Sequence, residues 1–347
     1  MVLTSERKQN NLNTVFDIAK LCLCTMIVCI HTNVMPSITF PWIRIAVPLF
    51  FLLSAYFLFQ KINSANRSEH TGILTTFLKR NLTLYLFWFV VLFPVTLHYD
   101  RWFSGRSMVQ GLMLMVKNFF FFELFRAGWF LMALMIGVVI VYYLSRFMSN
   151  RAILICTGFI YLLLCLRTAY SEILYQHATV VMTVFSKYED IFSRGYLSFP
   201  CGLFWIAWGK WFAEHAFSWS PKFCILNILL SAVVLFIEYW NIYVYDGQKA
   251  HECYLALPLL CLSVFQTLRS IPAFAAPYSK TLRKISTIVY TSHWSIALLL
   301  EEYSETIGNS KEHILLFMIT ICISLLLSVL LITLQRKKWF QWLKIAF

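Results

Sequence analysis

The chain has 347 residues, of which 60% are apolar, 18% aromatic and only 13% charged. Soluble globular domains carry charges on about a quarter of their residues, so this composition excludes an ordinary water-soluble protein and predicts a polytopic membrane protein. The net charge of +13 lies mainly in short tracts between apolar runs, as expected for anchors at a cytoplasmic surface, and this distribution disfavours nucleic-acid binding.

Windows of about 20 apolar residues predict an all-α membrane bundle of about ten transmembrane helices. The predicted spans are 15–35, 43–60, 82–98, 128–145, 152–169, 197–213, 223–242, 253–270, 285–303 and 313–335. We expect a single integral membrane domain over 1–347, with a cytoplasmic tail at 1–14, the bundle at 15–335 and a basic cytoplasmic tail at 336–347.

The stretch 108–125 is apolar but is broken by Lys117, Asn118 and Glu123. If it also crossed the membrane, the basic clusters at 280–284 and 336–338 would lie outside, against the positive-inside rule. We therefore expect a re-entrant or interfacial helix there, and both termini in the cytoplasm.

The first predicted span, 15–35, carries Asp17, Lys20 and His31, and we interpret it as a retained span rather than a signal peptide. Ionisable side chains in hydrocarbon are costly, so each is a candidate functional residue. In a helix, Lys20 and His31 lie on nearly the same face, roughly 16 Å apart along the axis. His31 suits a general base, and a histidine that merely bonds a neighbouring helix is the open alternative.

Further polar residues recur where spans begin or on one helix face. One face of the ninth span carries Ser286, Tyr290 and His293. These residues form either part of a functional site or a polar stripe that only holds neighbouring helices together. Lys79 and Arg80 open the third span, either as topogenic charges or as ligands for the phosphates of a cofactor. Arg44 opens the second span on the outer side, as an interfacial anchor or as part of an outer pocket with His31.

These residues form a pattern that resembles acyltransferase family 3 of integral membrane proteins. Lys20 and His31 match its basic residue, ten intervening positions and histidine, with Lys where Arg is commoner. The stretch 41–59, PWIRIAVPLFFLLSAYFLF, is similar to its second-span motif, with Ala55 in place of the usual glycine.

The similarity extends along the rest of the chain. LKRNLTLYLFW resembles the R-x-x-x-P-Y-x-x-W segment through Arg80, Tyr85 and Trp88, with Leu84 at the proline position. GWFLMAL, at 128–134, resembles the entry to the fourth span. The ninth span matches S-x-x-x-Y-x-x-H at Ser286, Tyr290 and His293.

The resemblance implies an enzyme of the inner (plasma) membrane that moves an acyl group, most often acetyl, from cytoplasmic acyl-CoA to a hydroxyl of an extracytoplasmic glycan or lipid-linked sugar, with no metal. It implies His31 as the base, with Tyr290 or His293 steadying the oxyanion or the acceptor. Lys20, Lys79 and Arg80 would bind the cofactor, and Arg44 and Ser286 the acceptor. Polysaccharide-assembly proteins are possible partners.

Three alternatives remain open at this stage. An acyl-histidine intermediate at His31 is a variant of the mechanism. A transporter or flippase would use His31, His293 and Lys20 as a proton relay, and a membrane sensor would have a degenerate site. Some members of the family carry a further esterase-like domain, and since this chain ends at Phe347 we expect direct transfer or hand-over to a separate protein.

Overall fold

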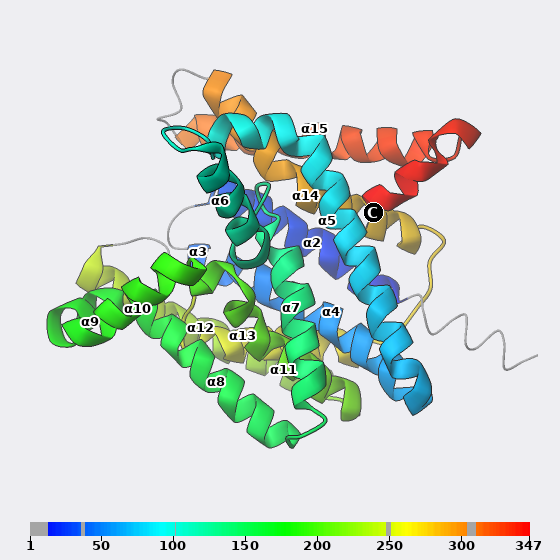
Figure 1. Ribbon diagram of the computed structural model, residues 1–347. Helices are drawn as coiled ribbons and strands as arrows, with labels where there is room; N and C mark the ends of the chain where they lie inside the picture. Colours follow the sequence, from blue (N-terminus) through cyan, green and yellow to red (C-terminus); the bar gives the residue numbers. More distant parts are fainter. Residues whose placement is uncertain (1–12, 36–38, 101, 248–250, 304–309) are drawn as a thin grey trace, which may run out of the picture.

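A computed structural model describes residues 13–35, 39–100, 102–247, 251–303 and 310–347. Every regular element within these ranges is a helix, which confirms the predicted all-α class (Figure 1).

A helix occupies each of the ten ranges predicted from the apolar windows. These helices are α2 (Thr14–His31), α4 (Ala46–Asn63), α5 (His70–Asp100), α7 (Trp129–Leu144), α8 (Asn150–Arg167), α11 (Phe199–Glu214), α12 (Pro221–Asp246), α13 (Leu257–Ser270), α14 (Ser279–Tyr303) and α15 (Ser310–Leu334). A short helix, α3 (Phe40–Ile43), precedes α4, and short 3-10 segments lie at η2 (Arg67–Glu69), η3 (Gly195–Leu197) and η4 (Lys338–Ala346).

Among the described residues, six helices are long and apolar enough to cross a membrane. Four of them lie in the single helices α2, α8, α12 and α15. The other two are α3 joined to α4 and η2 joined to α5. The helices α7, α11 and α13 have only 14–16 residues, or roughly 21–24 Å, which is shorter than the hydrocarbon core. A total of ten crossings therefore stays a prediction.

Three helices lie between the predicted spans. The first, α6 (Met108–Phe121), begins at a capping box in which the Ser107 and Gln110 side chains accept each other's backbone N–H groups. Its 14 residues span roughly 21 Å, and its re-entrant or interfacial placement stays a prediction. The other two, α9 (Ser171–His177) and α10 (Thr179–Phe192), were missed because their apolar residues are interspersed with polar ones.

The central helices are α2 and α4, with α8 and α11–α13 on one side of them and α5, α14 and α15 on the other (Figure 1). Two thirds of the apolar window of α4 is buried (67%), against 22% for α12 and for α15. Gly209 of α11 allows close packing on α4, because an added Cβ would lie 2.5 Å from the Leu52 carbonyl oxygen and 2.8 Å from the Ala55 Cβ.

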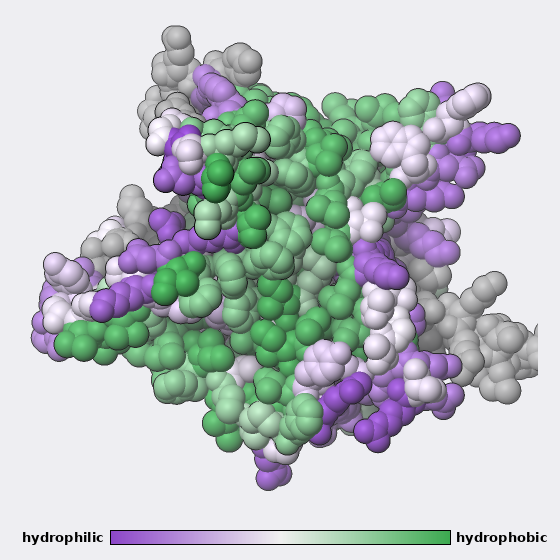
Figure 2. All heavy atoms as spheres, in the orientation of Figure 1, coloured by the Kyte–Doolittle hydropathy of each residue, from purple (hydrophilic) through white to green (hydrophobic). Residues whose placement is uncertain are grey.

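Hydrophobic residues cover the middle of the face in Figure 2, and hydrophilic residues gather at its edges. Large apolar side chains are exposed on several helices, among them Val90, Ile155, Val244 and Leu326. Such a broad apolar exterior fits a protein that has lipid around it.

Hydrogen bonds join helix ends at both ends of the bundle. At one end of the bundle, Thr14 at the start of α2 donates its N–H to the carbonyl of Phe274 before α14 (2.9 Å). At the other end, Tyr99 near the end of α5 donates to Glu302 near the end of α14 (2.6 Å). These contacts indicate that α2, α5 and α14, the first, third and ninth predicted spans, run in the same direction, and the cytoplasmic location of the first end stays a prediction.

Candidate active site

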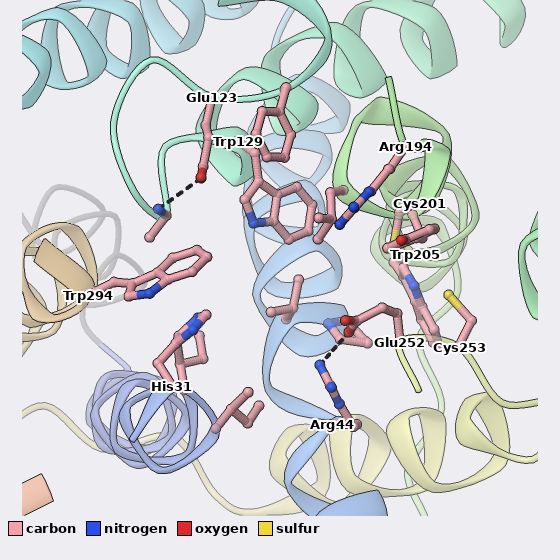
Figure 3. Close-up of a pocket in the computed structure, with 18 of the residues that line it drawn as sticks. His31, Arg44, Glu123, Trp129, Arg194, Cys201, Trp205, Glu252, Cys253 and Trp294 are labelled. Carbon is pink, nitrogen blue, oxygen red and sulfur yellow. Dashed lines mark hydrogen bonds and ion pairs between the residues drawn. The ribbon is translucent and has the colours of Figure 1, made fainter. Parts of the chain in front are cut away.

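A cavity of about 340 Å³ lies at the end of the bundle where α2 ends. Its lining includes His31 at the end of α2, Arg44 in the turn between α3 and α4, and Tyr290 of α14. In Figure 3, His31 and Trp294 lie on one side of this cavity, and Arg44, Glu252 and Arg194 lie on the other. The structure therefore brings together three of the residues that the sequence proposed for one site.

His31 is the last residue of α2, and its imidazole stacks on an indole. The ring centroids of His31 and Trp294 are 4.0 Å apart, with an interplanar angle of 23°. The His293 ring lies 5.3 Å from the His31 ring, centroid to centroid. No described residue forms a hydrogen bond with the His31 ring, so its nitrogens are free to meet a ligand.

His293 is fully buried in α14, and its surroundings define its tautomer. Its Nδ1 lies 2.7 Å from the Tyr290 carbonyl oxygen and 3.0 Å from that of Val289. Because carbonyls only accept, Nδ1 carries the proton in the neutral ring, and Nε2 is left as an acceptor. Nε2 is buried and has no partner among the described residues, so it can accept a hydrogen bond from a bound hydroxyl or from His31.

Trp294 is held in turn by Arg126, whose guanidinium carbon lies 5.6 Å from the centroid of an indole ring. Arg126 forms ion pairs with Asp100 at the end of α5 (2.7 Å) and with Glu123 (3.3 Å). A continuous series of contacts thus connects the end of α5 to the His31 ring, and it fixes the plane on which the imidazole rests.

The segment between α6 and α7, residues 122–128, closes over this cavity. The Tyr290 hydroxyl donates to the Ala127 carbonyl (2.8 Å), and Ala127 adopts a φ of 68°. The Leu124 N–H donates to the Tyr85 hydroxyl (3.0 Å). The Tyr290 hydroxyl is therefore engaged in this arrangement, and as a donor to an oxyanion it would have to exchange partners.

Glu123 in this segment is 1% exposed, and its carboxylate oxygens accept from Arg126 and from the Ala127 N–H (3.0 Å). Burial raises the pKa of Glu123 to about 8, although the Arg126 charge acts in the opposite direction.

Lys20, Lys79 and Arg80 lie toward the other end of the bundle, away from the cavity. The Lys20 ammonium lies 5.2 Å from the centroid of the Phe57 ring, and its charge interacts with those of Arg80 and Arg283. Lys79 and Arg80 are exposed on α5. We call Lys20, Lys79 and Arg80 the basic group; the charges of Lys20 and Arg80 interact, and Lys79 precedes Arg80 on α5.

Ser286 shares a face of α14 with Tyr290 and His293, but it does not line the cavity. Its hydroxyl donates to the Arg283 carbonyl (2.9 Å), and its own carbonyl accepts from the Cys24 thiol (3.0 Å). Ser286 thus sits in the contact between α14 and α2. An acceptor could reach it only if this contact opened.

The sequence did not identify several residues that line the cavity, namely Glu123, Arg194, Trp205, Glu252 and Trp294. Glu252 could have been paired with Arg44 only through knowledge of the fold, because 208 residues separate them. Trp294 follows His293 directly, but successive helical residues point about 100° apart, so the shared face of α14 did not include it.

The family model described as "Acyltransferase domain" matches residues 13–333. A protein of Enterococcus faecalis called "Amino-acid racemase" is 25% identical over 336 residues, which make up 92% of this chain and 46% of that protein. The chain thus spans about half the length of this curated relative. No solved structure matches the chain significantly.

Proposed function

The chain belongs to the acyltransferase family 3 of integral membrane proteins, and from this premise we propose that it moves an acyl group, acetyl in the first instance, from cytoplasmic acyl-CoA to a hydroxyl of an extracytoplasmic glycan or lipid-linked sugar. The enzyme is an acyltransferase with apolar, membrane-length helices. The donor, the acceptor and residence in the inner membrane belong to the proposal.

The observation that supports this proposal most strongly is the pair of imidazoles beside the cavity. The His31 imidazole has no hydrogen-bond partner among the described residues, and Nε2 of His293 is a buried acceptor without one. A buried acceptor without a partner is costly, so the site is arranged for a ligand that brings a donor. An acceptor hydroxyl is such a donor.

The chemical step balances with the side chains of this chain alone. One ring nitrogen of His31 takes the proton of the acceptor hydroxyl. At the same time, the hydroxyl oxygen attacks the carbonyl carbon of the thioester. The carbon–sulfur bond then breaks, and His31-H⁺ returns the proton to the leaving thiolate. The products are the acyl ester and free CoA. His293 would orient the acceptor hydroxyl, and Tyr290 is the candidate donor to the developing oxyanion.

The basic group at the other end of α2 suits the donor. Acyl-CoA carries a pyrophosphate and a 3′-phosphate, and Lys20, Lys79 and Arg80 would neutralise these groups at the cytoplasmic surface. The thiol arm would then extend into the bundle toward His31. Eleven residues of helix separate Lys20 from His31, a rise of roughly 16 Å. Arg44 would contact the acceptor.

Transfer of label from radioactive acetyl-CoA to a glycan extract tests this function on the purified full chain. Wild type and the exposed control His177→Gln should label glycan, whereas His31→Ala should label it at least about 100-fold more slowly. Binding of acetyl-CoA without transfer to any acceptor would contradict the proposal. Solute flux across vesicles with no acyl donor present, and with no labelled glycan, would support a transporter instead.

A further inference from the structure

The side of the cavity opposite His31 is rich in hydrogen-bond donors. Arg194 caps η3 and points its guanidinium toward the cavity (Figure 3). Arg194 is exposed, and its side chain forms no ion pair or hydrogen bond with any described residue. A guanidinium offers five N–H donors in a planar fork and no acceptor. This arrangement suits an anionic group.

Two buried donors in the same lining also lack partners. Trp205 of α11 is fully buried, and its indole N–H has no acceptor among the described residues. The buried Nε of Arg44 has none either. Buried donors without acceptors are unfavourable, and oxygen atoms of a ligand would satisfy them. The donors of Arg194, Trp205 and Arg44 would therefore all be satisfied by hydrogen-bond acceptors of a ligand.

The charges on this side sum to an excess of positive charge. Arg44 forms an ion pair with Glu252 and stacks over the Phe40 ring at 4.5 Å, so its charge is compensated. No carboxylate compensates Arg194 in the described part of the chain. One uncompensated cation in a partly enclosed cavity attracts a ligand of the opposite sign.

We propose that this side of the cavity, at Arg194 and Trp205, binds an anionic group of the acceptor, a carboxylate or a phosphate, while the acceptor hydroxyl faces His31. This inference rests on the proposed acyl transfer and specifies its acceptor as an acidic or phosphorylated sugar. The anionic group accepts hydrogen bonds from the guanidinium and the indole. The cavity, of about 340 Å³, is within the usual range for small-ligand sites, about 300–1,000 Å³.

Three sugars that differ at one group test the proposal on the full chain in lipid nanodiscs with acetyl-CoA. Glucose is neutral, glucuronate adds a carboxylate, and glucose 1-phosphate adds a phosphate. Wild type should acetylate at least one of the charged sugars with a kcat/KM about tenfold or more above that for glucose. Arg194→Gln should remove this preference, whereas Lys187→Gln, an exposed cation of α10, should keep it. The preferred charged sugar identifies the source of the anionic group.

Binding of glucuronate without acetyl-CoA, measured by saturation-transfer NMR, separates this proposal from the acyl transfer itself. Binding that weakens about tenfold in Arg194→Gln, without transfer to any sugar, would keep the anion site and overturn the acyl transfer. Equal use of all three sugars, unchanged in Arg194→Gln, would overturn the anion site and keep the acyl transfer. Absence of both binding and transfer would overturn both.

Discussion

The two ends of α2 differ in how their polar side chains are used. Asp17, in the first turn, is 1% exposed and accepts from the Ser279 hydroxyl (2.5 Å) and from two nitrogens of Arg283 (3.0 and 3.1 Å). The imidazole of His31, at the last turn, stacks on Trp294 and forms no hydrogen bond with any described residue. A fully bonded charge holds helices together, whereas an unbonded polar group beside a cavity is available to a ligand.

The same contrast separates Tyr290 and Ser286 from His293 on one face of α14. The two hydroxyls donate to carbonyls of the protein, while Nε2 of His293 has no donor in the described part of the chain. A shared helix face is therefore not sufficient to assign a common role. A group without a protein partner can meet a substrate directly, whereas a hydrogen-bonded group such as the Tyr290 hydroxyl must first exchange partners.

The largest effect on stability should come from breaking the bonded end of α2. Asp17→Ala leaves Ser279 and Arg283 without their acceptor, and we expect a loss of about 3 kcal/mol in the free energy of unfolding. This corresponds to more than a 100-fold change in the unfolding equilibrium. Denaturation of the purified protein measures it. Asp190→Ala, at an exposed residue of α10, is the control, and an equal loss in both variants would refute a special role for Asp17.

At the basic group near that end, Lys20→Gln should raise the KM for acetyl-CoA about tenfold, because a phosphate of the donor loses a charged partner. Acetyl-pantetheine lacks the phosphates of the nucleotide, so its KM should not change. Steady-state kinetics with the two donors provide the measurement. A similar rise in KM for both donors would show that Lys20 acts through the fold and not through phosphate binding.

Trp294 should act as a positioning residue for His31. Trp294→Ala removes the surface on which the imidazole stacks, and we expect kcat to fall about tenfold with KM for the donor unchanged. Trp294→Phe restores an aromatic face and should recover most of the rate. If both variants lost the same activity, the stacking geometry would not be the cause.

The pH dependence of stability should reflect the titration of Glu123. Its pKa is about 8 in the folded protein and about 4.3 in an unfolded chain. The folded state thus binds more protons between these values, and the stability that the protonated carboxyl retains is lost as pH rises from about 4.3 to 8. Glu123→Gln removes the titration and should flatten the melting temperature over this range. An unchanged slope would mean that Glu123 is ionised in the folded protein.

The sequence predicted the helices from their length and apolarity, and it predicted that His31, Arg44 and Tyr290 would share a site. Apolar windows were sufficient for the ten predicted spans and closeness in the chain for Arg44 beside His31, whereas Tyr290 was placed with His31 by the resemblance to acyltransferase family 3. Arg194 and Trp205 could not be found in this way, since one resembles any exposed loop cation and the other any packing aromatic. Their significance lies in donors that remain without acceptors, which is a property of the folded chain alone.

The central claim is that His31 removes the proton of the acceptor. The most direct test is the rate of acetyl transfer per folded molecule in His31→Gln, measured beside its melting temperature. The account predicts a rate at least about 100-fold below that of wild type with an unchanged melting temperature, because the imidazole forms no hydrogen bond that the fold requires. A rate close to that of wild type in the folded variant would contradict it.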